Sequence, residues 1–383
     1  MSDPAQKPAT PSLLSRSTSA FTIGLIGFLS KVFTDSLSRY QVHGLEEFMD
    51  LLEQRRDPMA RKRGLITISN HISIIDDPLL WAFLPFRNIF DPSNMRWSLG
   101  SYDLCYKNKI AGQFFFAGQV LPTHRLKHSP LGGLFQPTMR EAIRLLSDAP
   151  LPRPSSFPTN DSHTLFHPAI PETDPFSAPT VPYTYTTNGS DIWPSPSSYT
   201  SNRHAWIHIF PEGRVHQRRT MRYFRWGVAR LILEADECPD IVPMWIEGYN
   251  EVYPEDRGFP RSVPRLNKNL SIWLGKNVGG EIANPFLDLR RRWKDLVQRE
   301  TLGSHAPDLE LGTLPEVLQH GQEAVELRME CTKAVRDAVL EVRRTRGLPE
   351  EDSEAGLVET WREDGVDKQG TGKENDGTLF GDG

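Results

Sequence analysis

Residues 64–78 read Gly-Leu-Ile-Thr-Ile-Ser-Asn-His-Ile-Ser-Ile-Ile-Asp-Asp-Pro. The first six form a short, β-branched apolar run, which predicts a buried strand. Asp77 and Pro78 predict a helix start, with Asp77 as the N-cap and Pro78 as the first helical residue. The apolar run from Leu79 to Leu84 fits the helix that would follow. A strand that leads into a helix through a short turn is typical of α/β domains.

The same alternation continues along the chain. Apolar runs predict strands at 205–210, 241–246 and 270–274, and apolar stripes of helical period predict helices at 44–56, 137–146, 226–235, 285–299 and 315–346. The fold class predicted from this alternation is α/β.

Three segments are predicted to lie outside regular structure. Residues 1–17 are rich in Ser, Thr and Pro, and residues 150–202 hold 11 of the 31 prolines. Proline removes backbone donors, so we expect 150–202 to be a disordered or loosely packed surface insertion. Residues 348–383 are expected to form an acidic, disordered tail. The folded domain then comprises 18–149 and 203–347.

Charge is unevenly distributed along the chain. The net charge is −5, but residues 350–383 carry eleven acidic and three basic side chains, a net of −8, so residues 1–349 carry +3. A mildly basic body suits an anionic membrane surface and is far too weak a signal to indicate a nucleic-acid partner. Cys105, Cys238 and Cys331 are widely spaced, so we expect reduced thiols and no metal site.

The most apolar stretch covers residues 20–33, with the sequence AFTIGLIGFLSKVF. It is shorter than the ~18–20 apolar residues that span a bilayer. We expect an interfacial helix that dips into one leaflet; a core helix and a signal peptide are the alternatives.

His71 and Asp76 are the candidate catalytic pair. On a continuous helix their side chains would point ~140° apart, but across a strand-to-helix turn they can meet. A histidine held by a carboxylate can take a proton from a hydroxyl and return it, an effect worth ~10²–10⁴ in rate. The chain has no G-x-S-x-G elbow, so direct attack by a substrate hydroxyl is simpler than an acyl-enzyme. With 11 histidines in the chain, the spacing alone is a weak signal.

Two further clusters carry candidate binding residues. Phe210-Pro211-Glu212-Gly213 follows a predicted strand, where Glu212 would hold a polar head group or order a basic neighbour. The run GQVLPTHR at 118–125 offers Arg125 as a phosphate ligand. Six arginines follow the first cluster with no acid between them, which suits phosphate binding, a solvated charged face or a membrane-facing lip. They are Arg214, Arg218, Arg219, Arg222, Arg225 and Arg230.

The order NHxSxxDDP, GxxxPxxR, FPEG and IVPMW resembles the four sequence blocks of the glycerolipid acyltransferase superfamily. The flanking residues at 70–78, 206–215 and 225–227 resemble the tafazzin family in particular. The resemblance covers roughly residues 18–149 and 203–347.

The resemblance implies a single acyltransferase-type domain with a central, mostly parallel sheet flanked by helices. It implies that His71 and Asp76 are catalytic and that Arg125, Glu212 and Gly213 position the substrate, with Phe210 and Arg214 beside them. Tafazzins need no cofactor or metal and move acyl chains between phospholipids and lysophospholipids, including cardiolipin, monolysocardiolipin and phosphatidylcholine, without coenzyme A. They are peripheral or monotopic proteins of mitochondrial membranes facing the intermembrane space. The long insertion and the acidic tail depart from the family pattern; the insertion would either loop out or cover the groove.

Two other functions stay open at this point. An acyl-CoA-dependent lysophosphatidate acyltransferase of the endoplasmic reticulum would share the same blocks. A non-catalytic lipid-binding protein would be expected to lack the His or the Asp, and both are present. The sequence does not indicate acyl-chain preference or oligomeric state.

Overall fold

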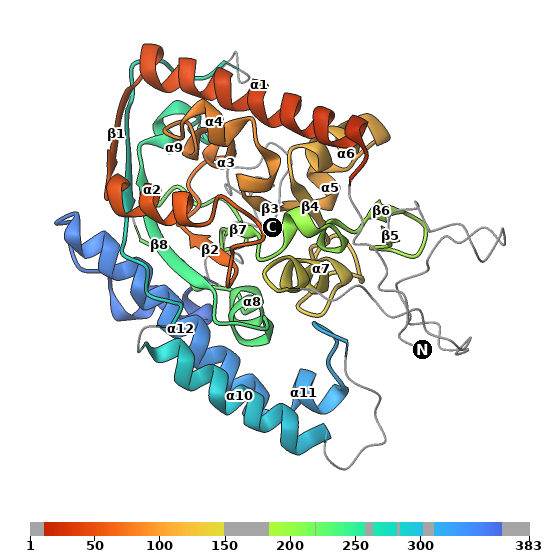
Figure 1. Ribbon diagram of the computed structural model, residues 1–383. Coiled ribbons are helices and arrows are strands. Elements are labelled where there is room, and N and C mark those ends of the chain that lie inside the picture. The colour runs from red at the N-terminus through yellow and green to blue at the C-terminus, as the bar shows by residue number, and fades with distance from the viewer. Residues whose placement is uncertain are drawn as a thin grey trace, which may run out of the picture.

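A computed structural model describes residues 11–148, 184–218, 220–256, 263–281, 284–301 and 310–361. A seven-stranded sheet lies between two layers of helices (Figure 1). Its order is β1-β9-β8-β2-β7-β3-β4, and all neighbours are parallel except β8 and β9. The α/β prediction with a mostly parallel sheet is confirmed. The strands are β1 (Arg39–His43), β2 (Leu65–Ile68), β3 (Trp97–Ser101), β4 (Val120–Thr123), β7 (Trp206–Ile209), β8 (Asp240–Glu247) and β9 (Asn269–Leu274).

The predicted strand at the start of the quoted stretch is β2, at the centre of the sheet. All four of its side chains are buried, because helices cover both faces. Leu65 packs into one hydrophobic cluster, whereas Ile66 and Ile68 pack into the other. This alternation follows from the two-residue period of a strand, and it explains why the run is apolar at successive positions.

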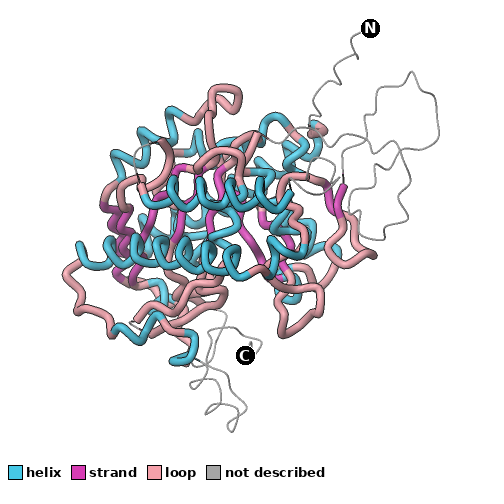
Figure 2. The backbone as a smooth tube through the Cα atoms, turned by 90° about the horizontal axis from the view of Figure 1, so that it is seen from below, coloured by secondary structure: helices cyan, strands magenta, loops and turns pink. Residues whose placement is uncertain are grey.

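One helical layer contains α7 (Pro137–Leu145), α8 (Gly227–Glu234), α10 (Pro285–Thr301) and α12 (Gln322–Thr345). Seen from below, two long helices cross the strands (Figure 2). The single helix predicted over 315–346 is wrong in one respect: Gly321 has an extended backbone and separates α11 (Glu316–His320) from α12.

The other layer is dominated by α1 (Leu13–Leu37), which lies across α3 (Asp76–Leu80), α4 (Phe86–Ile89) and α6 (Lys109–Ala117) (Figure 1). Gly24 permits this contact, since a Cβ atom there would lie 2.1 Å from the Phe90 ring. The helix extends well beyond residues 20–33, so two expectations need correction. Residues 13–17 are helical, and α1 is long and apolar enough to cross a membrane by length and composition alone. Residues 1–10 lie outside the described part. The layer also includes α2 (Leu45–Gln54) and α9 (Tyr249–Val252), with α5 (Tyr102–Cys105) after β3.

The end of the predicted insertion belongs to the folded domain. Residues 184–202 form a hairpin of β5 (Thr184–Tyr185) and β6 (Trp193–Pro194), followed by the short 3₁₀ helices η2 (Pro196–Ser198) and η3 (Thr200–Asn202). Buried Glu141 on α7 accepts hydrogen bonds from Ser195 Oγ (2.9 Å) and Ser197 N (2.7 Å). Predicting a disordered or loosely packed segment through to residue 202 was therefore wrong for this part. Residues 149–183 lie outside the described residues.

The acidic tail is also ordered in part. Residues 350–361 pack against the domain and include η4 (Ser353–Gly356). The predicted disorder is wrong for these residues, and residues 362–383 are outside the described part.

Replacing Glu141 with alanine tests how the 184–202 segment is held. The variant leaves buried donors of Ser195 and Ser197 without their acceptor, so its free energy of unfolding should fall by about 2–4 kcal/mol. Urea unfolding measures this, with Glu47→Ala at an exposed position of α2 as the control. Equal stability of the two variants would show that the carboxylate does not hold the segment.

Candidate active site

The candidate site lies where parallel strands end. β2 and β7 are neighbours, with Ile68 opposite Ile209. The residues that follow, including His71 after β2 and Glu212 after β7, therefore emerge at the same edge of the sheet. In open α/β sheets this carboxyl edge is where ligands bind.

The histidine and the aspartate predicted as a pair do meet. His71 Nδ1 lies 2.9 Å from Oδ2 of Asp76. The same oxygen accepts the backbone N–H groups of Ile72 (2.7 Å) and Ser73 (2.8 Å), which closes the turn between β2 and α3. With Nδ1–H donating to the carboxylate, the acceptor nitrogen of the ring is Nε2, which has no hydrogen-bond partner among the described residues.

The start of α3 differs from the prediction by two residues. The helix begins at Asp76, with Ile75 as its N-cap, so Asp77 does not cap it. Asp77 instead forms a partly buried ion pair with Arg96. Burial alone would raise the pKa of the Asp77 carboxyl, but the Arg96 guanidinium holds it below its ordinary value.

Asp76 is completely buried. Burial raises the pKa of its carboxyl, while the hydrogen bonds from His71, Ser73 and Ile72 act in the opposite direction. The donors that fix the turn therefore also oppose the effect of burial on this carboxyl. Such a carboxylate orients an imidazole and stabilises its protonated form.

Glu212 holds the backbone of His71. Its Oε1 accepts the His71 N–H at 2.9 Å, and its Oε2 accepts the Arg222 N–H at 3.2 Å. The His216 N–H donates to the His71 carbonyl at 2.7 Å, so the peptide of His71 is fixed on both sides. Both carboxyl oxygens of Glu212 therefore accept hydrogen bonds from the protein's own backbone. Burial raises the pKa of Glu212 to about 8, against the opposing effect of the His71 backbone donor.

Aromatic rings fix the imidazole plane. Phe210 stacks on His71 with ring centroids 4.1 Å apart and an interplanar angle of 18°. The edge of His208 lies behind Phe210. Burial lowers the pKa of His208 to about 3, so this second histidine stays neutral. His71 keeps a fifth of its side chain exposed and is the imidazole that a substrate can reach.

The glycine of the Phe210–Gly213 block makes room for an arginine. Gly213 has a φ of +74°, and a Cβ atom there would lie 2.4 Å from Nε of Arg225. Arg214 is partly exposed, and its guanidinium has no ion pair or hydrogen bond within the described residues. Of the other arginines predicted here, Arg230 pairs with Glu234 in the core, and Arg219 lies outside the described residues.

Arg125 follows β4 and therefore lies at the same sheet edge, two strands beyond β7. Its guanidinium pairs with Asp103, which follows β3, and the Nε–Oδ1 distance is 3.1 Å. Although burial acts to raise it, the pKa of Asp103 is lowered by Arg125 and Ser101. Arg125 thus shares the edge with His71 but makes no described contact with it.

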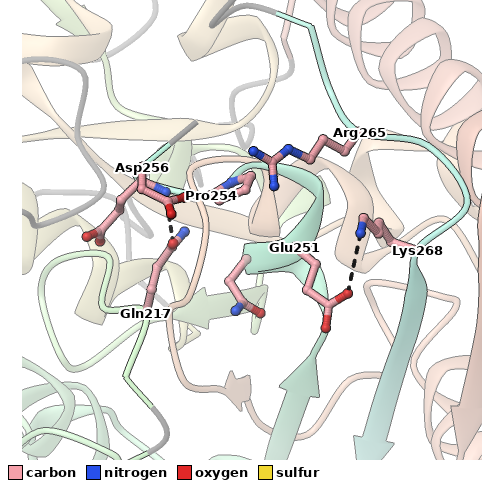
Figure 3. A pocket seen from close by; sticks show the side chains of 8 residues that line it. Gln217, Glu251, Pro254, Asp256, Arg265 and Lys268 are labelled. Atoms are coloured by element: carbon pink, nitrogen blue, oxygen red, sulfur yellow. Dashed lines mark hydrogen bonds and ion pairs between the residues drawn. The ribbon is translucent and has the colours of Figure 1, made fainter. Parts of the chain in front are cut away.

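A polar pocket of about 470 Å³ lies at the other side of the turn, beside α9 (Figure 3). Gln217 Nε2 donates to the carbonyls of Ile72 and Tyr253, both at 3.0 Å, and so joins the pocket to the turn between β2 and α3. The pocket is lined by Gln217, Asn250, Glu251, Pro254, Glu255, Asp256, Arg265 and Lys268.

The chain is 31% identical over 359 residues to a protein named tafazzin from Saccharomyces cerevisiae, covering 91% of this chain and 83% of the relative. The chain belongs to the tafazzin family. A Dictyostelium discoideum protein named taffazin is 28% identical over 255 residues, covering 66% of this chain and 67% of the relative. No family model matches the chain.

Among solved structures, the 1-acyl-sn-glycerophosphate acyltransferase PlsC of Thermotoga maritima is similar, with a TM-score of 0.37 and 13% identity over 76% of this chain and 81% of that one. At that score the likeness supports no conclusion. Membership of the tafazzin family makes the chain an acyltransferase enzyme that acts on phospholipids.

The sequence did not indicate His216, and it indicated Arg222 only as one of six arginines suited to phosphate binding or a charged surface, yet both residues hold the site. Their backbone N–H groups bind the His71 carbonyl and the Glu212 carboxylate. Backbone contacts of this kind do not depend on residue type. The one sequence signal for them is that both residues follow the Phe210–Gly213 block closely along the chain.

The raised pKa of Glu212 gives a pH-dependent stability. Between its ordinary pKa of 4.5 and its folded pKa of about 8, the folded state binds more protons than the unfolded state. The free energy of unfolding therefore falls as pH rises through this window, by an amount on the order of 2–4 kcal/mol. Glu212→Gln removes the titrating group, so wild type should lose stability relative to this variant between pH 5 and pH 8. If the free energies of unfolding of wild type and Glu212→Gln differ by the same amount at pH 5 and pH 8, the raised pKa of Glu212 is contradicted. Urea unfolding at both pH values measures it.

Proposed function

We propose that the chain is a phospholipid–lysophospholipid transacylase that works without coenzyme A and remodels cardiolipin by acylating monolysocardiolipin. One observation carries the proposal: His71 is held through Nδ1 by Asp76, while Nε2 is without a partner among the described residues. Membership of the tafazzin family supports the choice of lipid substrates.

In the proposed mechanism His71 acts as a general base. Nε2 takes the proton of the free hydroxyl of a lysophospholipid, and the hydroxyl oxygen attacks the ester carbonyl of a donor such as phosphatidylcholine. Asp76 fixes the tautomer and stabilises the imidazolium. When the tetrahedral intermediate collapses, the imidazolium returns the proton to the leaving glycerol oxygen of the donor. One ester bond forms and one breaks, so the reaction needs no cofactor.

The arginines at the sheet edge are proposed to bind lipid phosphate. Arg214 is partly exposed and unpaired within the described residues, and Arg225 lies against Gly213. Guanidinium groups suit phosphate oxygens, and phosphate is common to donor and acceptor lipids. Arg125, paired with Asp103, would bind only at the end of the edge away from β2. Glu212 is proposed to act on the substrate indirectly, by positioning His71.

An apolar face is proposed to bring the site to a membrane. Five side chains at helical spacing on α1 are 42–67% exposed: Phe21, Leu25, Phe28, Leu29 and Val32. Also exposed are Phe86 on α4, Phe90 directly after it, and Ile110 and Phe114 on α6. The ring centroids of Phe28 and Phe86 lie 6.3 Å apart. This surface fits interfacial binding to one leaflet, in keeping with a peripheral or monotopic protein. We propose mitochondrial membranes facing the intermembrane space as its location.

Activity without coenzyme A distinguishes the proposed function from its rivals. Purified chain should transfer a labelled acyl group from phosphatidylcholine to monolysocardiolipin in vesicles free of coenzyme A. His71→Ala should lower the rate about 10²–10⁴-fold because the general base is lost, and Asp76→Asn should lower it at least about 100-fold. His320→Ala, at an exposed position of α11, is the control. Turnover only with acyl-CoA would favour the lysophosphatidate-type enzyme, and full activity of His71→Ala would refute the mechanism.

Two charges on α1 test the membrane face. The double variant Phe21→Glu/Leu29→Glu places two carboxylates within the exposed stripe, so binding to anionic vesicles should weaken by at least about tenfold. Co-sedimentation with vesicles measures this. Met329→Glu changes an equally exposed apolar residue on α12 and should bind like wild type. Equal loss in both variants would place the membrane face elsewhere.

A further inference from the structure

The acidic tail contains a short segment that packs against the loop after β7, next to the candidate active site. Within residues 350–361, the Glu351 side chain is 5% exposed and Trp361 is 6% exposed. Both pack against the loop that follows β7, residues 210–226. A buried carboxylate and a buried indole are unusual in a tail of this composition, so their contacts need a reason.

Glu351 anchors the segment to that loop. Its Oε1 accepts the Met221 N–H at 2.6 Å, and its Oε2 accepts from Arg336 Nη2 on α12 at 2.8 Å. Arg336 also donates to the carbonyls of Met221 (2.7 Å) and Arg222 (3.0 Å). Both backbone groups of Met221 are therefore fixed by the Glu351–Arg336 pair.

Trp361 covers the next turn of the same loop. Its ring edge meets His216 with centroids 4.5 Å apart, and Cζ of Arg222 lies 5.0 Å from its ring centre. The indole nitrogen of Trp361 has a hydrogen-bond acceptor, but two guanidinium nitrogens of Arg222 have none within the described residues. The indole N–H donates to the Ala355 carbonyl at 2.7 Å, whereas Nε and Nη1 of Arg222 are buried with no hydrogen-bond partner in the described chain. The indole of Trp361 is thus one of two aromatic rings in the described part of the protein that contact this guanidinium, the other being Tyr223 at 5.3 Å.

The two residues beneath Trp361 are those that hold the catalytic histidine. The His216 N–H binds the His71 carbonyl, and the Arg222 N–H binds Glu212, which in turn accepts the His71 N–H. Trp361 therefore contacts one residue linked to the His71 carbonyl and one residue linked, through Glu212, to the His71 N–H.

We propose that residues 350–361 are a strap that positions His71, with Trp361 as the positioning residue at its end. The strap touches no substrate and works by keeping the loop after β7 closed on the His71 backbone. Its effect on catalysis rests on the proposed function, whereas its effect on the loop does not.

The experiment compares Trp361→Ala, Trp361→Phe and the control Leu357→Ala in the full chain. Leu357 lies in the same segment, is half exposed and makes no hydrogen bond through its side chain. Hydrogen exchange should speed up about tenfold at the amides of His216, Arg222 and His71 in Trp361→Ala, with core strands unchanged. In the transacylase assay kcat should fall about tenfold or more while KM for the lysolipid stays within about twofold, because a misplaced base slows chemistry and not binding.

Trp361→Phe keeps an aromatic face over Arg222, so it should restore kcat to within about threefold of wild type. Exchange in Trp361→Ala that is unchanged, or that rises equally throughout the domain, would overturn the strap. If exchange speeds up locally in Trp361→Ala but the wild-type chain is inactive as a transacylase, the strap is supported and the proposed function is refuted.

Discussion

The site depends on one carboxylate oxygen. Oδ2 of Asp76 accepts hydrogen bonds from the His71 ring and from the backbones of Ile72 and Ser73, all within 2.9 Å. These three bonds draw a five-residue separation into a closed turn, which a continuous helix could not do. The same oxygen therefore shapes the backbone, orients the imidazole and offsets the cost of burying its own charge.

The sheet supplies the rest of the geometry. Because β2, β7, β3 and β4 are successive parallel neighbours, the residues after each strand gather at one edge. His71, Glu212, Asp103 and Arg125 lie along it in that order, although long stretches of chain separate them. The two oxygens of Glu212 accept the backbone N–H groups of His71 and Arg222, so Glu212 holds the His71 backbone in place.

Much of this was predictable because it is encoded locally. The apolar run before His71 predicted a strand buried on both faces, and the spacing to Asp76 predicted the turn. Contacts between distant segments were not predictable from composition. The composition of residues 184–202 predicted a loosely packed chain. Nothing in the local sequence shows that Glu141, 54 residues from Ser195, accepts hydrogen bonds from this segment. Trp361 was likewise assigned to a disordered tail, because its partners lie on the loop after β7.

The most direct test of the account is an experimental structure of the chain with a bound lysophospholipid. We expect the free glycerol hydroxyl within about 3.2 Å of Nε2 of His71, with the acyl chain directed to the exposed face of α1. A lysolipid whose hydroxyl lies away from His71, for example in the polar pocket beside α9, would contradict the assignment of this histidine as the base.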